Sequence, residues 1–282
     1  MARHAAMPRG AGALTRATFV LGLAVLALAS VSAGAVESLI ALRTAYAREV
    51  DRRLSIPDAE ADRYAALLAN AFAARGLGAI PPQHALLVDR NPKVQAALVF
   101  WKSPAGTWRL VGASPCSTGR EGAYEHFLTP LGVFDHGYRH GDFRAEGTRN
   151  DKGVLGYGEK GMRVFDFGWI DAPRGWGDRR PGVLRLQVHA TDHELLEPRL
   201  GQACSKGCVR IPATLNVFLD RHGILDEDYE RTLAAGTPVW QLRADRIPTP
   251  WPGRYLVVVE TGRTARPMWA RPGPVSVRLR PR

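Results

Sequence analysis

The two side chains in this sequence best suited to chemistry are a cysteine that follows a glycine and a histidine upstream of it. The cysteine lies in Ser205-Lys206-Gly207-Cys208-Val209-Arg210, and the histidine lies in Val188-His189-Ala190-Thr191. A thiol attacks an acyl group as its thiolate, so an imidazole has to accept the thiol proton. Gly207 permits a turn that presents the sulfur beside backbone N–H donors. The pattern therefore predicts acyl transfer by a cysteine nucleophile.

These two segments resemble the signature of the YkuD-type L,D-transpeptidases, which re-link the stem peptides of peptidoglycan. In that family a histidine, a small residue and a threonine end a strand, and Ser-x-Gly-Cys-Val/Ile-Arg follows. Other family elements occur here in order: two strands, a Ser-Thr-Gly and a Thr-Pro-x-Gly-x-Phe. They correspond to residues 85–90, residues 94–101, Ser117-Thr118-Gly119 and Thr129-Pro130-Leu131-Gly132-Val133-Phe134.

The resemblance implies a role for each residue of the signature. Cys208 would attack the carbonyl between the third residue and the terminal D-residue of a tetrapeptide stem, and a thioester would form. His189 would take the thiol proton and return it to the departing amine, while the Ala190 carbonyl orients the other ring nitrogen. The N–H groups of Gly207 and Cys208 would hold the oxyanion. Arg210 would fix the loop or bind a substrate carboxylate.

The remaining signature residues, Ser205, Lys206 and Thr191, would bind substrate or orient the loop. Two positions depart from the family pattern: Ala190 stands where glycine is common, and Lys206 stands where histidine is common. The Lys206 side chain would lie beside the thiol, which bears on substrate preference. The resemblance implies no metal and no organic cofactor. The acceptor stays open, because a stem amine, a lipoprotein lysine, a free D-amino acid or water could accept the acyl group.

Two other classes of protein compete with a cysteine acyltransferase. His189 and His193 are four residues apart, as are Cys204 and Cys208, which approximates zinc-ligand spacing and would suit a zinc-dependent wall hydrolase. Closed sites of this kind are usually structural, and they would leave the other family elements unexplained. The third hypothesis is a silent peptidoglycan-binding module, because free cysteine is often only a buried core residue.

The N-terminus predicts export. Arg3, Arg9 and Arg16 come with no acidic residue, an apolar run extends over residues 19–31, and small residues follow at Ala33 and Ala35. This order is typical of a secretory signal peptide over residues 1–35, or of an uncleaved N-terminal anchor in the membrane. We therefore expect a periplasmic protein whose partners are peptidoglycan stem peptides.

The net charge of +11 does not indicate a nucleic-acid binder. The arginines are scattered among acidic residues, and no aromatic and basic stripe or nucleic-acid motif accompanies them. The carboxylates of peptidoglycan stem peptides are the anionic partner that we expect.

Hydrophobic spacing divides the rest of the chain into three regions. Residues 36–82 show two runs at helical spacing, which predict a helical hairpin. Residues 83–242 contain short β-rich runs and form the predicted catalytic domain, for which the family implies a β-sandwich. The fold class is thus mostly β in the catalytic domain and α+β overall. Residues 243–282 predict a proline-rich C-terminal extension with one strand. The other strands are expected at residues 96–101, 108–113, 164–170, 183–188 and 239–242.

Three local predictions concern the surroundings of the cysteine. A short helix is expected within residues 212–222, and its N-terminal end would favour the thiolate. Residues 135–142, which are polar and rich in glycine, could line the peptide groove, bind a metal through their histidines or form a solvated hairpin tip. Cys116 and Cys204 could form a disulfide and leave Cys208 free.

Overall fold

The computed structural model describes Met1 and residues 37–271. Apart from Met1, the expected signal peptide lies outside the described residues, as do residues 272–282 of the expected extension. Within residues 37–271, no helix combines the length and apolar character that a membrane span requires.

The larger sheet has five strands in the order β3-β2-β1-β9-β4. Its strands are β1 (His84–Asp89), β2 (Ala96–Lys102), β3 (Trp108–Pro115), β4 (Gly132–Asp135) and β9 (Tyr255–Val259). Only the β1 and β9 pair is parallel, and the other neighbours are antiparallel. Every residue of β1 and β2 is buried, which agrees with their nearly continuous apolar sequence, because both faces of this sheet are covered.

The smaller sheet has four strands in the order β5-β6-β7-β8. They are β5 (Phe143–Arg144), β6 (Arg163–Pro173), β7 (Pro181–His189) and β8 (Val209–Arg210). The β7 and β8 pair is parallel, with Val188 opposite Val209 and His189 opposite Arg210. This pairing brings the histidine segment and the cysteine segment to the same edge of the sheet.

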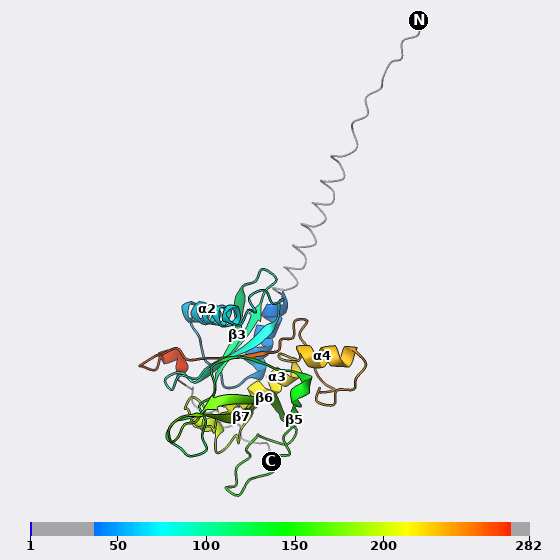
Figure 1. The fold of residues 1–282 in the computed structure, drawn as a ribbon. Helices are drawn as coiled ribbons and strands as arrows, with labels where there is room; N and C mark the ends of the chain where they lie inside the picture. Colours follow the sequence, from blue (N-terminus) through cyan, green and yellow to red (C-terminus); the bar gives the residue numbers. More distant parts are fainter. Residues whose placement is uncertain (2–36, 272–282) are drawn as a thin grey trace.

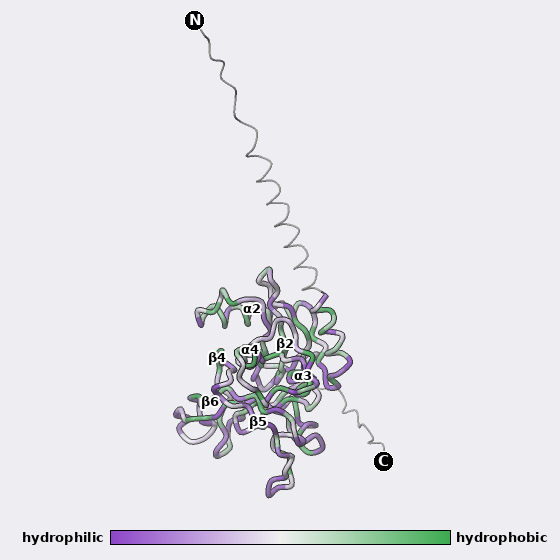
Figure 2. The backbone as a smooth tube through the Cα atoms, turned by 90° about the vertical axis from the view of Figure 1, so that its right-hand side faces the viewer, coloured by the Kyte–Doolittle hydropathy of each residue, from purple (hydrophilic) through white to green (hydrophobic). Residues whose placement is uncertain are grey.

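The helices cover both faces of the larger sheet. They comprise helical residues 37–49, α2 (Asp58–Ala74), α3 (Ala213–Arg221) and α4 (Glu227–Ala234), with 3-10 turns at Tyr138–His140, Glu197–Arg199 and Met268–Ala270. Figures 1 and 2 place α2 and β5 at opposite ends of the folded part of the chain, and Figure 1 shows α3 close to β6 and β7.

Two apolar cores result from this arrangement. The inner core lies between the sheets, and it includes Leu42, Tyr46, Leu86, Val99, Phe165, Val188, Val209, Phe218 and Leu256. The outer core lies under α2, and it includes Tyr64, Leu68, Phe72, Leu87, Leu98, Phe100 and Val257. The larger sheet is therefore the middle layer between α2 and the inner core.

The observed fold is α+β with two mixed sheets, and helical and strand residues are about equally numerous. The expected mostly β sandwich is therefore only partly correct. Both N-terminal helices exist, but they do not form a self-packed hairpin. Residues 37–49 bury Leu42 and Tyr46 in the inner core, whereas α2 buries Tyr64 and Phe72 in the outer core. Spacing along the chain predicted the helices but could not predict which face of the sheet each one covers.

The C-terminal part of the chain needs a second correction. β9, which we placed in an extension outside the catalytic domain, lies in the interior of the larger sheet between β1 and β4. The expected strand at residues 239–242 is a turn in which the Leu242 N–H donates to the Val239 carbonyl. The expected helix within residues 212–222 is present as α3.

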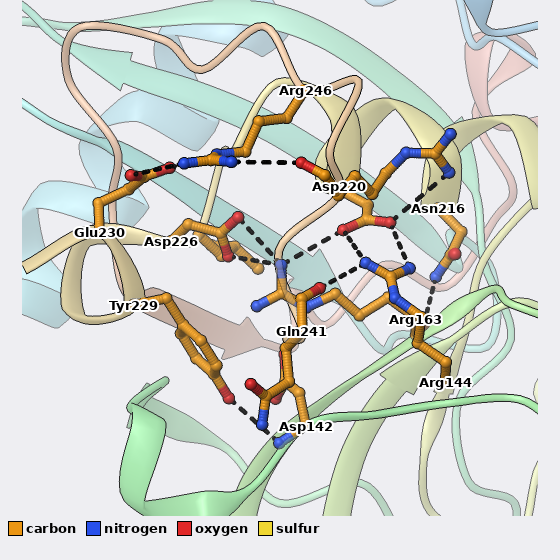
Figure 3. Close-up of polar contacts among 12 residues, drawn as sticks. Asp142, Arg144, Arg163, Asn216, Asp220, Asp226, Tyr229, Glu230, Gln241 and Arg246 are labelled. Atoms are coloured by element: carbon orange, nitrogen blue, oxygen red, sulfur yellow. Dashed lines mark hydrogen bonds and ion pairs between the residues drawn. The ribbon is translucent and has the colours of Figure 1, made fainter. Parts of the chain in front are cut away.

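A buried cluster of charged residues joins β5, β6, α3 and α4 (Figure 3). At its centre is Arg163, which is fully buried and whose guanidinium lies 2.6 Å from Asp142, 2.8 Å from Asp226 and 3.3 Å from Asp220. Arg144 makes a second ion pair with Asp220, at 2.8 Å. The apolar environment makes each unpaired charge costly, so the members of this cluster depend on one another.

The cluster also corrects our interpretation of residues 135–142. His136 is fully buried, with Nδ1 2.8 Å from the Leu225 carbonyl and Nε2 2.9 Å from Asp142. Both ring nitrogens therefore face acceptors, which favours the imidazolium. Burial alone would lower the pKa of His136, but the Asp142 carboxylate raises it above its ordinary value. His136 and Asp142 thus belong to an ion-pair core, whereas Arg139 and Gly141 between them are exposed.

We expect Arg163→Met to destabilise the fold strongly, because it leaves three buried carboxyl groups without their common cation. The free energy of unfolding should fall by about 3–5 kcal/mol in urea titrations. Arg139→Met is the matched control, because Arg139 forms an exposed ion pair with Asp135, and it should cost at most about 1 kcal/mol. Equal losses in the two variants would contradict the central place of Arg163.

The raised pKa of His136 predicts a pH dependence of stability. The folded state holds the proton more tightly than the unfolded state, so this contribution is complete below about pH 6.5 and is lost as the pH rises through the folded pKa. The free energy of unfolding should fall in that interval by up to about 1.4 kcal/mol per pH unit. His136→Gln should remove this slope. His140→Gln should keep it, because burial and then Arg139 lower the pKa of His140. A slope that survives in His136→Gln would refute the assignment.

Candidate functional site

The parallel pairing of β7 with β8 places the signature residues on one face of the smaller sheet. Val188 and Val209 point into the inner core. Because side chains alternate along a strand, Gln187 and His189 of β7 lie on the other face, together with Cys208 and Arg210. The expected nucleophile and the expected base are thus brought together by tertiary structure.

The loop that carries Cys208 is held internally by Ser205. The Ser205 hydroxyl donates to the Cys208 carbonyl at 2.6 Å and accepts from the Gly207 N–H at 3.0 Å. Gly207 has a φ of +130°, and a Cβ there would lie 2.9 Å from the Leu184 side chain. The tight turn that we expected at Gly207 therefore requires glycine for both backbone and packing reasons.

The upstream family elements clamp this loop from outside. The Thr129 hydroxyl donates to the Gly207 carbonyl at 2.6 Å and accepts from the Gly119 N–H at 2.9 Å. The Ser205 N–H donates to the Thr118 carbonyl at 2.9 Å. A Cβ on Gly119 would lie 1.9 Å from the Phe127 carbonyl oxygen, so only glycine allows this approach. The Ser-Thr-Gly and Thr-Pro elements thus meet at the loop of the cysteine.

His189 is buried and has a defined ring orientation. Its Nδ1 lies 2.5 Å from the Ala190 carbonyl oxygen, and since a carbonyl only accepts, Nδ1 carries the proton and Nε2 is left as an acceptor. The expected contact with Ala190 is therefore present, and its catalytic role stays a prediction. Burial and the nearby Arg210 lower the pKa of His189 to about 4, although the hydrogen bond to Ala190 acts in the opposite direction.

The surroundings of the Cys208 thiol favour its neutral form. Its Sγ lies 3.6 Å from the Arg185 carbonyl and 4.0 Å from Gln187 Oε1, and among the described residues no hydrogen bond joins it to His189. Burial raises the pKa of Cys208 to about 11. At the start of α3, Glu197 Oε2 accepts from the Ala213 N–H at 3.1 Å, so a carboxylate already lies against this helix end. The expected effect of the helix on the thiol stays a prediction.

One expected oxyanion donor is already in use. The Gly207 N–H donates to Ser205, so it is not free for an oxyanion in this conformation. The Cys208 N–H has no acceptor among the residues that the structure describes, and it remains the available donor. The sequence could not predict this, because the hydroxyl of Ser205 competes for the same N–H group only once the turn has formed.

The other expected binding residues differ in their surroundings. Arg210 donates to the Cys204 carbonyl at 3.4 Å, which supports a role in holding the loop, and within residues 37–271 it has no carboxylate partner. Lys206 lies 3.4 Å from Glu125 at the surface, and no contact joins it to the thiol in the described part of the chain. Thr191 is buried, and its hydroxyl has no hydrogen-bond partner there.

Sequence reasoning missed four residues that surround the thiol and the imidazole. Tyr157 packs its ring against His189 with centroids 4.7 Å apart, and its hydroxyl lies 3.2 Å from Gln187 Oε1. Asp166 pairs with Arg185 at 2.7 Å and with Gln187 at 2.9 Å. The alternation of polar residues along residues 183–189 could have indicated Arg185 and Gln187, but no local signal pointed to Tyr157.

The described residues form neither the zinc site nor the disulfide that the cysteines suggested. No group of three histidine, cysteine or acidic side chains among them is placed to hold a metal ion, so His189, His193, Cys204 and Cys208 do not form the zinc set that their spacing allowed. All three cysteines are free thiols, and Cys204 Sγ lies 3.4 Å from the Ser117 hydroxyl. The possible Cys116 to Cys204 disulfide is therefore not formed.

Comparison with known proteins adds little to this geometry. No protein-family model matches the sequence, and no curated protein matches it. Four chains among the solved structures match. One is the helical cell shape determining protein Pgp2 from Campylobacter jejuni, at 15% identity and a TM-score of 0.31, over 67% of this chain and 51% of that one. A lysine-to-alanine mutant of the same protein gives 14% identity, a TM-score of 0.28 and the same coverage. This chain thus spans about half the length of Pgp2, and similarity at this level establishes neither a common fold nor a common function.

Proposed function

We propose that this protein is a periplasmic L,D-transpeptidase that acts on peptidoglycan tetrapeptide stems through a cysteine thioester. The observation that carries the proposal is the placement of Cys208 and His189 on one face of the β7 and β8 pair, with His189 Nε2 left as an acceptor. A second support is the clamp on the cysteine loop, which is built from residues of the upstream elements.

The proposed reaction begins from a neutral thiol and a neutral imidazole. Substrate binding excludes water, and His189 Nε2 takes the proton while Cys208 Sγ forms a bond to the carbonyl carbon of the third residue. The C–N bond to the terminal D-residue then breaks, and the imidazolium returns its proton to the departing amine. Because the pKa of His189 is about 4, the base is unprotonated across the neutral range. An acceptor amine reverses these steps and releases the cysteine.

Two groups beside the thiol can recognise the donor stem. The Cys208 N–H is available for the developing oxyanion. Arg210, opposite His189 in the strand pairing, lies near both reacting side chains, and no carboxylate in the described part of the chain neutralises it. A guanidinium of this kind suits a stem-peptide carboxylate, because the two planar groups form paired charge-assisted hydrogen bonds.

One observation favours a second candidate, a silent peptidoglycan-binding module. Burial raises the pKa of Cys208 to about 11, and such a thiol is a poor nucleophile until substrate rearranges the site. An L,D-carboxypeptidase would use the same residues with water as the acceptor. Mass spectrometry of a purified tetrapeptide muropeptide after incubation separates these cases, since a dimer, an exchange product, a trimmed tripeptide and unchanged substrate have different masses.

Cys208→Ala should abolish conversion of the muropeptide while the protein stays folded, because the variant removes only the nucleophile. Cys204→Ala is the matched control, since Cys204 Sγ contacts the Ser117 hydroxyl and the variant keeps the Cys204 carbonyl that accepts from Arg210. The control should keep most of its activity in the same mass-spectrometric assay, and circular dichroism should report the folded state of both variants. Equal loss of activity in both variants would argue against Cys208 as the sole nucleophile.

His189→Gln should slow formation of the thioester by about a hundredfold or more, the usual scale for a lost general base. Substrate affinity should change little, because the variant keeps a polar side chain of similar size. Single-turnover measurements of the acyl-enzyme by intact-protein mass spectrometry give the rate. Acylation at nearly the normal rate would remove His189 from the mechanism.

A further inference from the structure

Gln187 is next to Cys208 and shares one face of β7 with His189, and the two reacting side chains of the proposed mechanism share no hydrogen bond among the described residues. Gln187 Oε1 is 3.2 Å from the Tyr157 hydroxyl, which donates to it, and 4.0 Å from Cys208 Sγ. The Tyr157 ring packs edge-on against the His189 ring at 4.7 Å and 70°. The Gln187 amide oxygen thus contacts the thiol directly. It also contacts Tyr157, whose ring packs against the imidazole.

Asp166 determines which way this amide points. The carboxylate is fully buried, and its Oδ2 accepts from Gln187 Nε2 at 2.9 Å. Its Oδ1 accepts from the Gly168 N–H at 2.8 Å, so the carboxylate is itself held by the bulge in β6. With Nε2 directed at a carboxylate, Oε1 has to face Tyr157 and the thiol.

Asp166 also fixes the strand next to the sulfur. Arg185 pairs with Asp166 Oδ2 at 2.7 Å, and the Arg185 carbonyl is the other contact of Cys208 Sγ, at 3.6 Å. The Asp166 N–H in turn donates to Asp142 Oδ1 at 2.8 Å, which attaches this group to the buried ion-pair cluster. The contacts around the thiol are thereby connected, through Asp142, to Arg163.

We propose that Gln187 is a positioning residue. Asp166 holds the Gln187 amide in place, and Gln187 in turn aligns the Cys208 thiol with His189 through Tyr157. This inference rests on the proposed function. Gln187 itself does not react, but a displacement of about 1 Å in reacting groups is enough to change a rate by about a hundredfold. Tyr157 keeps its hydrogen bond to Gln187 when the thiol proton moves to His189, so the alignment persists through acylation.

The test exchanges the amide at position 187 with the carboxylate at position 166. Gln187→Glu places two carboxylates against each other and should slow acylation by about tenfold to a hundredfold with little change in KM. Combining it with Asp166→Asn restores a donor and an acceptor, because the new amide can donate to the new carboxylate. The same change removes the ion pair between Asp166 and Arg185, so the double variant should recover only part of the lost rate, but it should acylate faster than Gln187→Glu. Gln202→Glu, an exposed change in the loop before Cys204, is the matched control and should behave as wild type.

A second readout needs no catalysis. Gln187→Leu releases Tyr157, so the carbon-bound proton resonances of the His189 ring should move towards their positions in Tyr157→Leu, as the ring-current shift disappears. The exchanged double variant should keep the wild-type resonances. The His189 signals are identified by their absence in His189→Gln, and melting temperatures show that each variant is folded.

The two readouts separate this proposal from the proposed function. If wild-type protein forms no thioester but the His189 resonances follow the pattern described, the positioning role stands and the transpeptidase function fails. If wild-type protein forms the thioester and Gln187→Glu acylates at the wild-type rate, the positioning role is overturned. It is also overturned if the double variant is no faster than Gln187→Glu, or if Gln187→Leu leaves the His189 resonances unchanged.

Discussion

The short parallel pairing of β7 with β8 is the contact on which the candidate site depends. Only Val188 with Val209 and His189 with Arg210 are in register, yet this suffices to put the cysteine and the histidine on one face. Two residue pairs cannot hold a strand by themselves. Further support comes from Ser205 inside the loop, from Thr129 outside it, and from Ser117, which exchanges two backbone hydrogen bonds with Arg210.

A second constraint lies beneath the same sheet. Arg163 and its three carboxyl partners are buried where β6 meets α3 and α4, and a charge in such a place is tolerated only when its partners are fixed. Asp142 belongs to this cluster and also accepts from the Asp166 N–H. The positions of the residues around the thiol therefore depend on the buried ion-pair cluster as well as on the loop.

Much of the secondary structure could be predicted from the sequence, because the apolar runs at β1 and β2, the β-rich run at β6 and the helical spacing before residue 75 are local signals. The buried side chain of His136 could not, since its partners Asp142 and Leu225 come from separate parts of the chain. The same limit explains why β9 was assigned to an extension. Its central position in the sheet depends on pairing with β1, which is far away in sequence.

For the site, the motif predicted the need for glycine at position 207, which its positive φ bears out, and the proximity of the cysteine and histidine segments, which the β7 and β8 pairing provides. The roles of Cys208 as nucleophile and His189 as base stay predictions. The motif did not predict the pKa values of the two side chains or which backbone N–H groups are free. The pKa values of Cys208 and His189 depend on burial, and the use of the Gly207 N–H depends on the Ser205 rotamer. The sequence thus predicted candidate reacting groups, and the structure adds that burial raises the pKa of the candidate thiol to about 11.

The most direct measurement of the central claim is the intact mass of the protein after incubation with a carbapenem, whose strained lactam resembles the scissile amide. The resemblance to L,D-transpeptidases predicts an increase of one inhibitor equivalent, located on Cys208 by peptide mapping, absent in Cys208→Ala and unaffected by chelators. Protein that stays unmodified by several carbapenems, while an added metal restores peptide cleavage, would contradict the cysteine mechanism.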